Sequence, residues 1–232
     1  MTVKEAIQQI YKYIFVPKVQ QAKSTKYVKE AVILLFLASA MIGSFYLYRS
    51  WKMNGERAAQ KAFAECLQEY QRAFEGSDEA WSEVVMVCKL GYERHSSTNI
   101  GPFFLGLQAD ALIMDNKKQE ALELVSQMID IFSSANPVAN LYKTKRALLK
   151  LDSTNIAMQR EARQELQVLA YDQNNKNADQ AYYYLGYDHW INNNVDQAQK
   201  VWQELIIKFK TDDPKASSMW ALLAEQKLQQ IA

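Results

Sequence analysis

Residues 178–214 read ADQAYYYLGYDHWINNNVDQAQKVWQELIIKFKTDDP, and this stretch has the clearest structural pattern in the chain. Apolar residues recur at helical spacing over residues 178–191 and again over residues 195–209. Three asparagines at 192–194 separate the two runs, and asparagine is a common turn residue. Pro214 follows the second run, where proline disfavours continuation of a helix. The stretch therefore predicts two helices joined by a short turn.

The same plan of paired helices extends toward the N-terminus. The pattern predicts a long helix over residues 51–74 and a partner that ends near Gly91, with Ser77 or Asp78 as its cap. No stretch alternates at period two, so we expect an all-α chain without a sheet. Further helices are predicted over 102–115, 119–132, 138–151, 155–171 and, as a final unpaired helix, 217–231. A small residue near the start of each second helix marks the repeat, at spacings of 41, 41 and 36 residues: Ala80, Ala121, Ala162 and Ala198.

The unit at residues 178–214 resembles the tetratricopeptide repeat, whose period is about 34 residues. Gly186 and Ala198 have a steric reason to be small, because the paired helices approach each other there. The second unit matches less well, with Gln108 at a leucine position, and units one and three keep only the helical period and the alanine. The resemblance implies an α-solenoid of about four helix pairs, closed by a C-terminal capping helix. The residues that carry it are Tyr182 at the Trp-like position, the pair Leu185-Gly186, Ala198 in the second helix and Trp202 as the following aromatic.

An uncharged apolar run, AVILLFLASAMIGSFYLY, occupies the 18 positions of Ala31–Tyr48. At a helical rise of about 1.5 Å per residue it spans roughly 27 Å, which is enough to cross a hydrocarbon core. We interpret it as a transmembrane helix, because a buried core helix of this length would normally show a polar stripe. A signal peptide cleaved after Ala38-Ser39-Ala40 is the alternative, but the apolar run continues past that site.

The charges on either side of this run indicate its orientation. Residues 1–48 carry six lysines against two glutamates, a net charge of +4, whereas the remainder of the chain carries −3. The positive-inside tendency then predicts a cytoplasmic basic segment at 1–30, a transmembrane helix at 31–48 and an extracytoplasmic helical domain at 49–232. In a bacterial inner membrane that domain would be periplasmic. Apolar residues spaced along 3–14 predict an amphipathic helix, which would lie on the lipid surface or pack on a partner.

The sequence offers little for catalysis. It lacks a glycine-rich phosphate loop and the common zinc-protease and serine-hydrolase motifs, so we expect no enzyme activity, no cofactor and no metal site. His95 and His189 have no ligand-like neighbours, and a formal net charge of +1 does not suggest nucleic acid as a partner. Cys66 and Cys88 lie at similar distances from the turn between their helices. Outside the cytoplasm they could form a disulfide; otherwise they are two small buried side chains.

Function is therefore expected at the surface of the helical domain. Tyr183, Tyr187 and Trp190 share one helix face at i, i+4 and i+7, and aromatic side chains are favoured binding anchors. The corresponding positions of the second unit are Phe103, Asp110 and Ile113. We predict that these six residues bind partners. The alternative is that the C-terminal helix folds across the face of Tyr183, Tyr187 and Trp190 and buries these three side chains.

Taken over nearly its whole length, the plan of a basic segment, one span and degenerate repeats resembles the YfgM-like ancillary subunits of the bacterial secretion translocon. The resemblance implies a membrane-anchored scaffold that recruits periplasmic chaperones or nascent secreted chains. The final unit also resembles Tol-associated periplasmic tetratricopeptide proteins, but those have cleaved signals and no anchor. A structural accessory subunit of another membrane or cell-envelope complex is the alternative function. A third, an exported enzyme regulator, would require signal cleavage.

Overall fold

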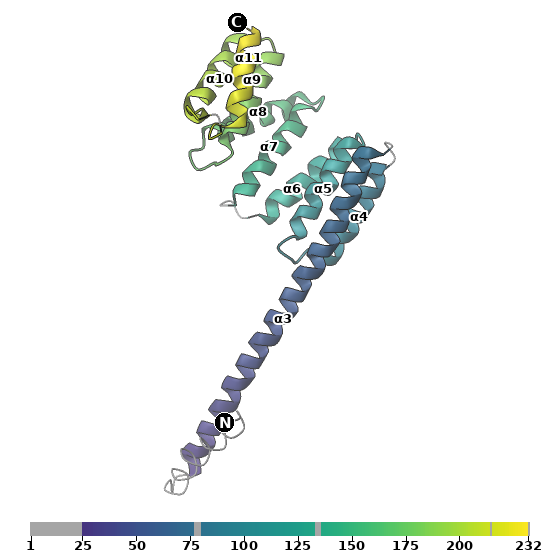
Figure 1. Cartoon of the computed structure of the whole chain (residues 1–232), viewed down its shortest axis with the longest axis vertical. Helices are drawn as coiled ribbons and strands as arrows, with labels where there is room; N and C mark the ends of the chain where they lie inside the picture. Colours follow the sequence, from purple (N-terminus) through teal and green to yellow (C-terminus); the bar gives the residue numbers. More distant parts are fainter. Residues whose placement is uncertain (1–24, 77–79, 133–135, 214, 232) are drawn as a thin grey trace. The chain divides into compact units, whose positions relative to one another are not determined.

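The computed structural model describes residues 25–76, 80–132, 136–213 and 215–231, with side chains from residue 31 onward. Over these residues the chain forms nine α-helices and no strand, as the sequence predicts. It divides into two compact units, Met1–Gly55 and Glu56–Ala232, and one helix contributes to both. The helices are α3 (Thr25–Glu75), α4 (Ala80–His95), α5 (Gly101–Met114), α6 (Lys118–Ile131), α7 (Pro137–Leu151), α8 (Ile156–Tyr171), α9 (Ala178–Ile191), α10 (Val195–Phe209) and α11 (Met219–Ile231) (Figure 1).

In the first unit, the described residues all belong to α3. Among the described helices, α3 alone is long and apolar enough to cross a membrane. Its most apolar window of 18 residues has a mean hydropathy of 2.0 and is 0% buried within the structure. Phe36 and Leu47, for example, are 73% and 74% exposed. Within the part of the chain that the structure describes, this apolar stretch is therefore not part of a protein core. The amphipathic pattern at 3–14 lies outside the described residues.

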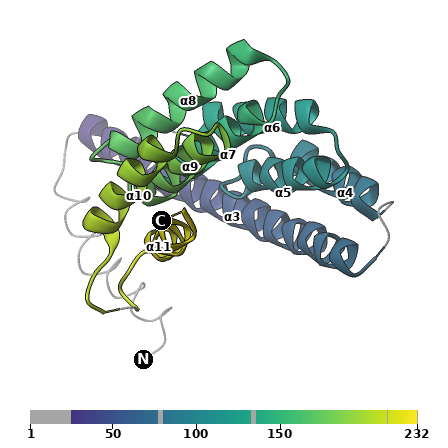
Figure 2. The same ribbon diagram turned by 90° about the horizontal axis from the view of Figure 1, so that it is seen from above.

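The second unit is a stack of helix pairs, as the tetratricopeptide-like pattern predicts. The C-terminal part of α3 pairs with α4, and the pairs α5–α6, α7–α8 and α9–α10 follow, each packed against the next. First helices also meet across the repeats, since α9 contacts α7. The last helix, α11, packs against both α9 and α10 at the C-terminal end (Figure 2). The four pairs and the capping helix that the sequence predicts are all present.

From α5 onward, helix ends agree with the predicted ranges to within two residues. The ranges predicted at 31–48 and 51–74 belong to one helix, α3, which begins at Thr25. The helix predicted to end near Gly91 continues to His95 in α4. Gly91 is a helix-interior glycine whose lack of a side chain admits the ring of Phe104, because a Cβ there would lie 2.5 Å from the ring atom Cδ1. The glycine therefore serves close packing and does not end the helix. The proposed caps at 77 and 78 lie outside the described residues.

Two turns with the same geometry punctuate the second and fourth repeats. Asn116 and Asn193 have φ angles of 59° and 60°, in the left-handed region that asparagine tolerates better than most side chains. In the fourth repeat, the N–H of Asn193 donates to the carbonyl of Trp190 at 3.0 Å. The N–H of Asn194 donates to the carbonyl of His189 at 2.9 Å. These bonds satisfy the last carbonyls of α9, so the asparagine run at 192–194 ends this helix and starts α10.

Buried apolar side chains in the described part of the second unit form three clusters. One joins α3, α4 and α5 around Phe104, a second joins α5 and α6 around Val125, and a third extends from α7 to α11 around Trp202. In the third cluster a Cβ on Gly186 would lie 2.5 Å from the indole nitrogen Nε1 of Trp202. That nitrogen donates a buried hydrogen bond of 3.0 Å to the carbonyl of Tyr183. Position 186 therefore requires a small residue because the Trp202 indole lies against it.

Cys66 of α3 and Cys88 of α4 lie in the first cluster, and both are fully buried. Their Cα atoms are 5.2 Å apart, and the structure joins their sulfur atoms in a disulfide. The bond connects the helix that contains the apolar stretch to the second helix of the first repeat. It closes a chain segment of 22 residues.

Candidate functional site

The C-terminal helix covers part of the aromatic face of α9. Tyr183 is only 9% exposed, with its ring centroid 5.3 Å from that of Trp220 in α11 and 6.2 Å from that of Trp202 in α10. Trp190 is half-buried against the same cluster, and Lys227 Nζ of α11 lies 4.7 Å from its ring centroid. The C-terminal helix thus covers Tyr183, which is the alternative to partner binding raised from the sequence. Tyr183 is a core residue and not an open anchor.

Tyr187 differs from these two aromatics because it remains 37% exposed. It lines a hollow of about 310 Å³ whose walls come from the C-terminal end of α7 and the exposed face of α9. Most of the wall is apolar, so the hollow suits an aliphatic or aromatic side chain. The other lining residues are Leu148, Leu151 and Asp152 of α7 and its C-cap, with Tyr184, Asp188 and Ile191 of α9.

Both carboxylates at this α7–α9 hollow already have cationic partners. Asp188 is 3% exposed and accepts a charge-assisted hydrogen bond of 2.8 Å from Arg163 Nε. The amide of Asn192 also donates to Asp188, at 3.1 Å. Asp152 forms an ion pair with Lys118 Nζ. These two negative charges are compensated within the repeat stack. A partner would therefore contact chiefly the apolar wall of the hollow.

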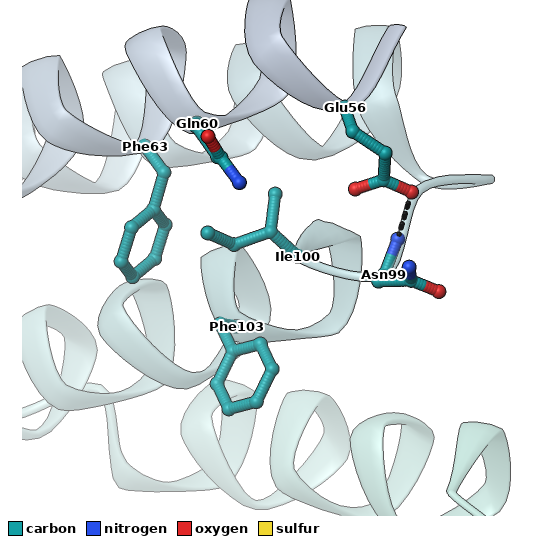
Figure 3. A pocket seen from close by; sticks show the side chains of 6 residues that line it. All are labelled: Glu56, Gln60, Phe63, Asn99, Ile100 and Phe103. Carbon is teal, nitrogen blue, oxygen red and sulfur yellow. Dashed lines mark hydrogen bonds between the residues drawn. The ribbon is translucent and has the colours of Figure 1, made fainter. Parts of the chain in front are cut away.

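A second hollow, of about 470 Å³, lies between α3 and the start of α5 (Figure 3). Two phenylalanine rings line it, and each is held by another ring behind it. The Phe63 centroid is 5.3 Å from that of Phe104, and the Phe103 centroid is 5.8 Å from that of Phe132. The six lining residues are Glu56, Gln60, Phe63, Asn99, Ile100 and Phe103.

The two remaining candidates do not line either hollow. Asp110 of α5 forms an ion pair with Lys145 of α7, so it links two neighbouring first helices. Burial, followed by the charge of Asp110, raises the pKa of Tyr142 to about 12. Ile113 packs, partly buried, against the α5–α6 cluster. Of the six residues predicted to bind partners, Phe103 and Tyr187 thus line hollows, and the other four take part in packing or ion pairing.

Sequence reasoning missed Glu56, Gln60 and Asn99. Glu56 Oε1 accepts a hydrogen bond of 2.8 Å from the backbone N–H of Asn99, and 43 positions separate these residues in the chain. No short motif marks either residue. Only the packing of α3 against α5 brings them together.

The described residues show no clear site for chemistry. Within the described ranges, no group of three or more His, Cys, Asp or Glu side chains is arranged to hold a metal ion. The ring of His95 stacks on Phe104, with centroids 6.4 Å apart and planes at 19°. His189 is half-buried in α9. Both histidines therefore occupy packing positions.

Comparison with known proteins gives a likeness at the level of the fold. No protein-family model matches the chain, and no curated protein matches it. Two solved structures are similar: a kinesin light chain-like protein from Podosopora anserina with nearly identical TPR-like repeats, and a single-substitution variant of it. Each is 15% identical over 76% of this chain; the variant is covered over 85% of its length with a TM-score of 0.56, and the parent over 86% with 0.55. At this identity the likeness establishes a TPR-like fold.

Proposed function

We propose that this protein is a membrane-anchored scaffold for protein–protein interaction, and an ancillary subunit of the secretion translocon that recruits periplasmic chaperones or nascent secreted chains. The observation that carries the proposal is the continuity of α3. This one helix contains the apolar stretch and also provides the first helix of the repeat stack. Stacked helix pairs expose extended surfaces that bind polypeptides, and such folds typically act without catalysis.

Exposure of the apolar stretch supports the membrane anchor. Side chains of Ala31–Tyr48 find no protein core among the described residues, and their transfer from water to lipid is strongly favourable. A soluble protein seldom leaves so large a contiguous apolar surface uncovered. The anchor therefore accounts for a surface that water would otherwise contact.

The cysteine pair supports an extracytoplasmic location for the repeat domain. A disulfide persists in oxidising compartments such as the periplasm and is rare in the reducing cytosol. Cys66 and Cys88 both follow the apolar stretch, so their bond agrees with the orientation inferred from the flanking charges. Two independent features thus favour a cytoplasmic N-terminus and a periplasmic C-terminal domain.

A second candidate function is a structural accessory subunit of another membrane or cell-envelope complex. The observation that favours it is the covering of Tyr183 and Trp190 by α11, which reduces the open aromatic surface available to transient partners. A subunit of this kind would be found in fixed stoichiometry with its complex. A recruiting scaffold would instead be recovered with translocon subunits and chaperones together.

Membrane extraction and co-purification test the proposal. Full-length chain expressed in a Gram-negative bacterium should resist alkaline carbonate extraction, retain its N-terminal segment by intact mass, and be digested by protease added to spheroplasts. Release by carbonate, or cleavage after Ala40, would remove the anchor. Gentle detergent extraction should then recover translocon and chaperone subunits, whereas recovery of one different complex in fixed stoichiometry would favour the second candidate.

A matched pair of variants connects partner capture to the α7–α9 hollow. Tyr187→Ala removes an exposed wall of the hollow and should lower partner recovery without loss of helicity. Ile207→Ala is the control, because Ile207 is 81% exposed on α10 and lines neither hollow. Equal recovery with both variants would show that this hollow does not bind the partner.

A further inference from the structure

The hollow between α3 and α5 has an apolar end and an acidic end. Figure 3 shows Phe63 at one end, Glu56 with Asn99 at the other, and Gln60 and Ile100 between them. Residues 56, 60 and 63 share one face of α3, because they are spaced at i, i+4 and i+7. At about 1.5 Å per residue, the first and last of these positions are roughly 10 Å apart along the helix.

Glu56 brings a negative charge to this hollow that no described side chain neutralises. Its carboxylate accepts from the neutral backbone N–H of Asn99, and it forms no ion pair with any described residue. No lysine or arginine is among the six lining residues. Asp152 and Asp188 at the α7–α9 hollow differ in this respect, since each has a cationic partner. Glu56 is half-buried, where a charge interacts more strongly than in bulk water.

The apolar end is held in place before any partner arrives. Phe104 and Phe132 support the rings of Phe63 and Phe103 from behind. The loop before α5 is closed by backbone hydrogen bonds from the Thr98 N–H to the His95 carbonyl and from the Gly101 N–H to the Thr98 carbonyl, at 3.0 and 3.1 Å. A binding surface that is already ordered loses less conformational entropy when it is occupied.

Two amide side chains also line the hollow: Gln60 lies between its two ends, and Asn99 lies beside Glu56 (Figure 3). Gln60 and Asn99 are exposed, and their side-chain amides make no hydrogen bond to another described residue. An extended peptide presents backbone N–H and C=O groups along its length, and amide side chains can both donate to and accept from them. The hollow therefore offers polar groups suited to a backbone as well as a place for a side chain.

We propose that this hollow binds an extended peptide segment that has an aromatic or large aliphatic side chain and, three positions away, a lysine or arginine. In the polyproline-II conformation an extended chain advances about 3.1 Å per residue with three residues per turn, so side chains three positions apart lie on the same side and about 9 Å apart. That spacing covers the distance from the phenylalanine end to Glu56. The apolar side chain packs between Phe63 and Phe103, and the cation pairs with the Glu56 carboxylate. This inference refines the proposed scaffold function and rests on it for its biological role, although the binding itself can be tested alone.

Synthetic peptides test the charge and the spacing. The full chain is placed in nanodiscs of neutral phosphatidylcholine, and binding of a labelled, end-capped peptide containing Phe-Ala-Ala-Lys is followed by fluorescence anisotropy, with empty discs subtracted. The Lys→Glu and Phe→Ser versions of the peptide are compared with it. One ion pair at a half-exposed site is worth about fivefold in affinity, so the lysine peptide should bind at least that much more tightly than the glutamate peptide. Equal affinity for the two peptides would overturn the proposal.

Variants of the chain assign the preference to Glu56. Glu56→Gln keeps an oxygen that accepts from the Asn99 N–H, so the fold is retained while the lysine preference falls about fivefold. Glu56→Lys should reverse the preference in favour of the glutamate peptide. Asp152→Asn is the matched control, because it removes a carboxylate from the other hollow and should leave the preference unchanged. A preference that survives Glu56→Gln, or that is lost with Asp152→Asn, refutes the assignment.

The peptide measurement also separates this inference from the proposed function. Lysine-selective binding without recovery of translocon partners would leave the hollow established and the translocon role refuted. Tyr187-dependent partner recovery without lysine-selective peptide binding would refute the inference alone.

Discussion

Substitution of Gly186 by alanine should destabilise the repeat stack, although the same change in most helices is stabilising. In an exposed helix interior, alanine is favoured over glycine by about 1 kcal/mol. At position 186 the new Cβ would lie 2.5, 2.6 and 2.9 Å from three atoms of the Trp202 ring. Trp202 is 0% exposed, so its ring cannot move outward without disturbing the α7–α11 cluster.

The magnitude follows from three contributions. Overpacking of a dense core costs about 1–3 kcal/mol. Displacement of the indole also weakens the buried hydrogen bond from Trp202 Nε1 to the Tyr183 carbonyl, worth about 1 kcal/mol. The gain in helix propensity offsets about 1 kcal/mol of this loss. We expect Gly186→Ala to lower the free energy of unfolding by about 2 kcal/mol.

Urea unfolding of the full chain in mild detergent, followed by far-UV circular dichroism and tryptophan fluorescence, measures this difference. Gly55→Ala is the control, because a Cβ at position 55 would have no heavy atom within 4 Å and should stabilise α3 slightly. In a Trp202→Phe background the penalty at position 186 should largely disappear, since the smaller ring leaves room for the methyl group. A Gly186→Ala chain as stable as the parent would refute the packing argument.

Three further results are expected. Replacement of Cys66 and Cys88 together by alanine should lower the free energy of unfolding by about 3 kcal/mol, from the closed segment of 22 residues, and mass spectrometry after alkylation of the native chain should find no free thiol. Ser218→Ala should cost about 1 kcal/mol and speed amide exchange in α11, because the hydroxyl caps that helix and donates to Asp179 Oδ2 at 2.6 Å. The raised pKa of Tyr142, about 12 against an ordinary value of 10.0, favours its protonated form in the folded chain. Its contribution to stability is therefore complete below pH 10 and is lost as the pH rises toward 12, and Tyr142→Phe should make the alkaline fall in the urea midpoint less steep.

Local patterns determined the helices well because they act over a few residues. The asparagine run at 192–194 separates α9 and α10 at the residues predicted, since asparagine both tolerates the left-handed turn and ends the helix. Gly91 misled the prediction, because a glycine that ends a helix and one that admits a neighbouring ring look alike in a sequence. Only the position of Phe104 distinguishes them.

The candidate site could be predicted only in part, because it depends on contacts between distant segments. Periodicity placed Tyr183 and Tyr187 on one face, but the packing of α11 covers Tyr183 and leaves Tyr187 exposed. The contact of Trp220 with Tyr183 joins distant segments and is not encoded by spacing along α9. Glu56 and Asn99 could not be recognised from the sequence, because no motif marks either residue. Only the packing of α3 against α5 brings them together.

The bond between Cys66 and Cys88 also governs how an anchored domain would bear tension. In an anchored chain a pull would enter the domain through α3, and the non-covalent contacts of a helix pair yield one turn at a time when one helix is peeled from the other. The disulfide transfers the force from Cys66 directly to Cys88, so the chain between these two residues carries none of it. In a chain anchored through its apolar stretch, peeling of α3 from α4 would therefore stop at Cys66 while the bridge is intact, and a reductant would remove that stop.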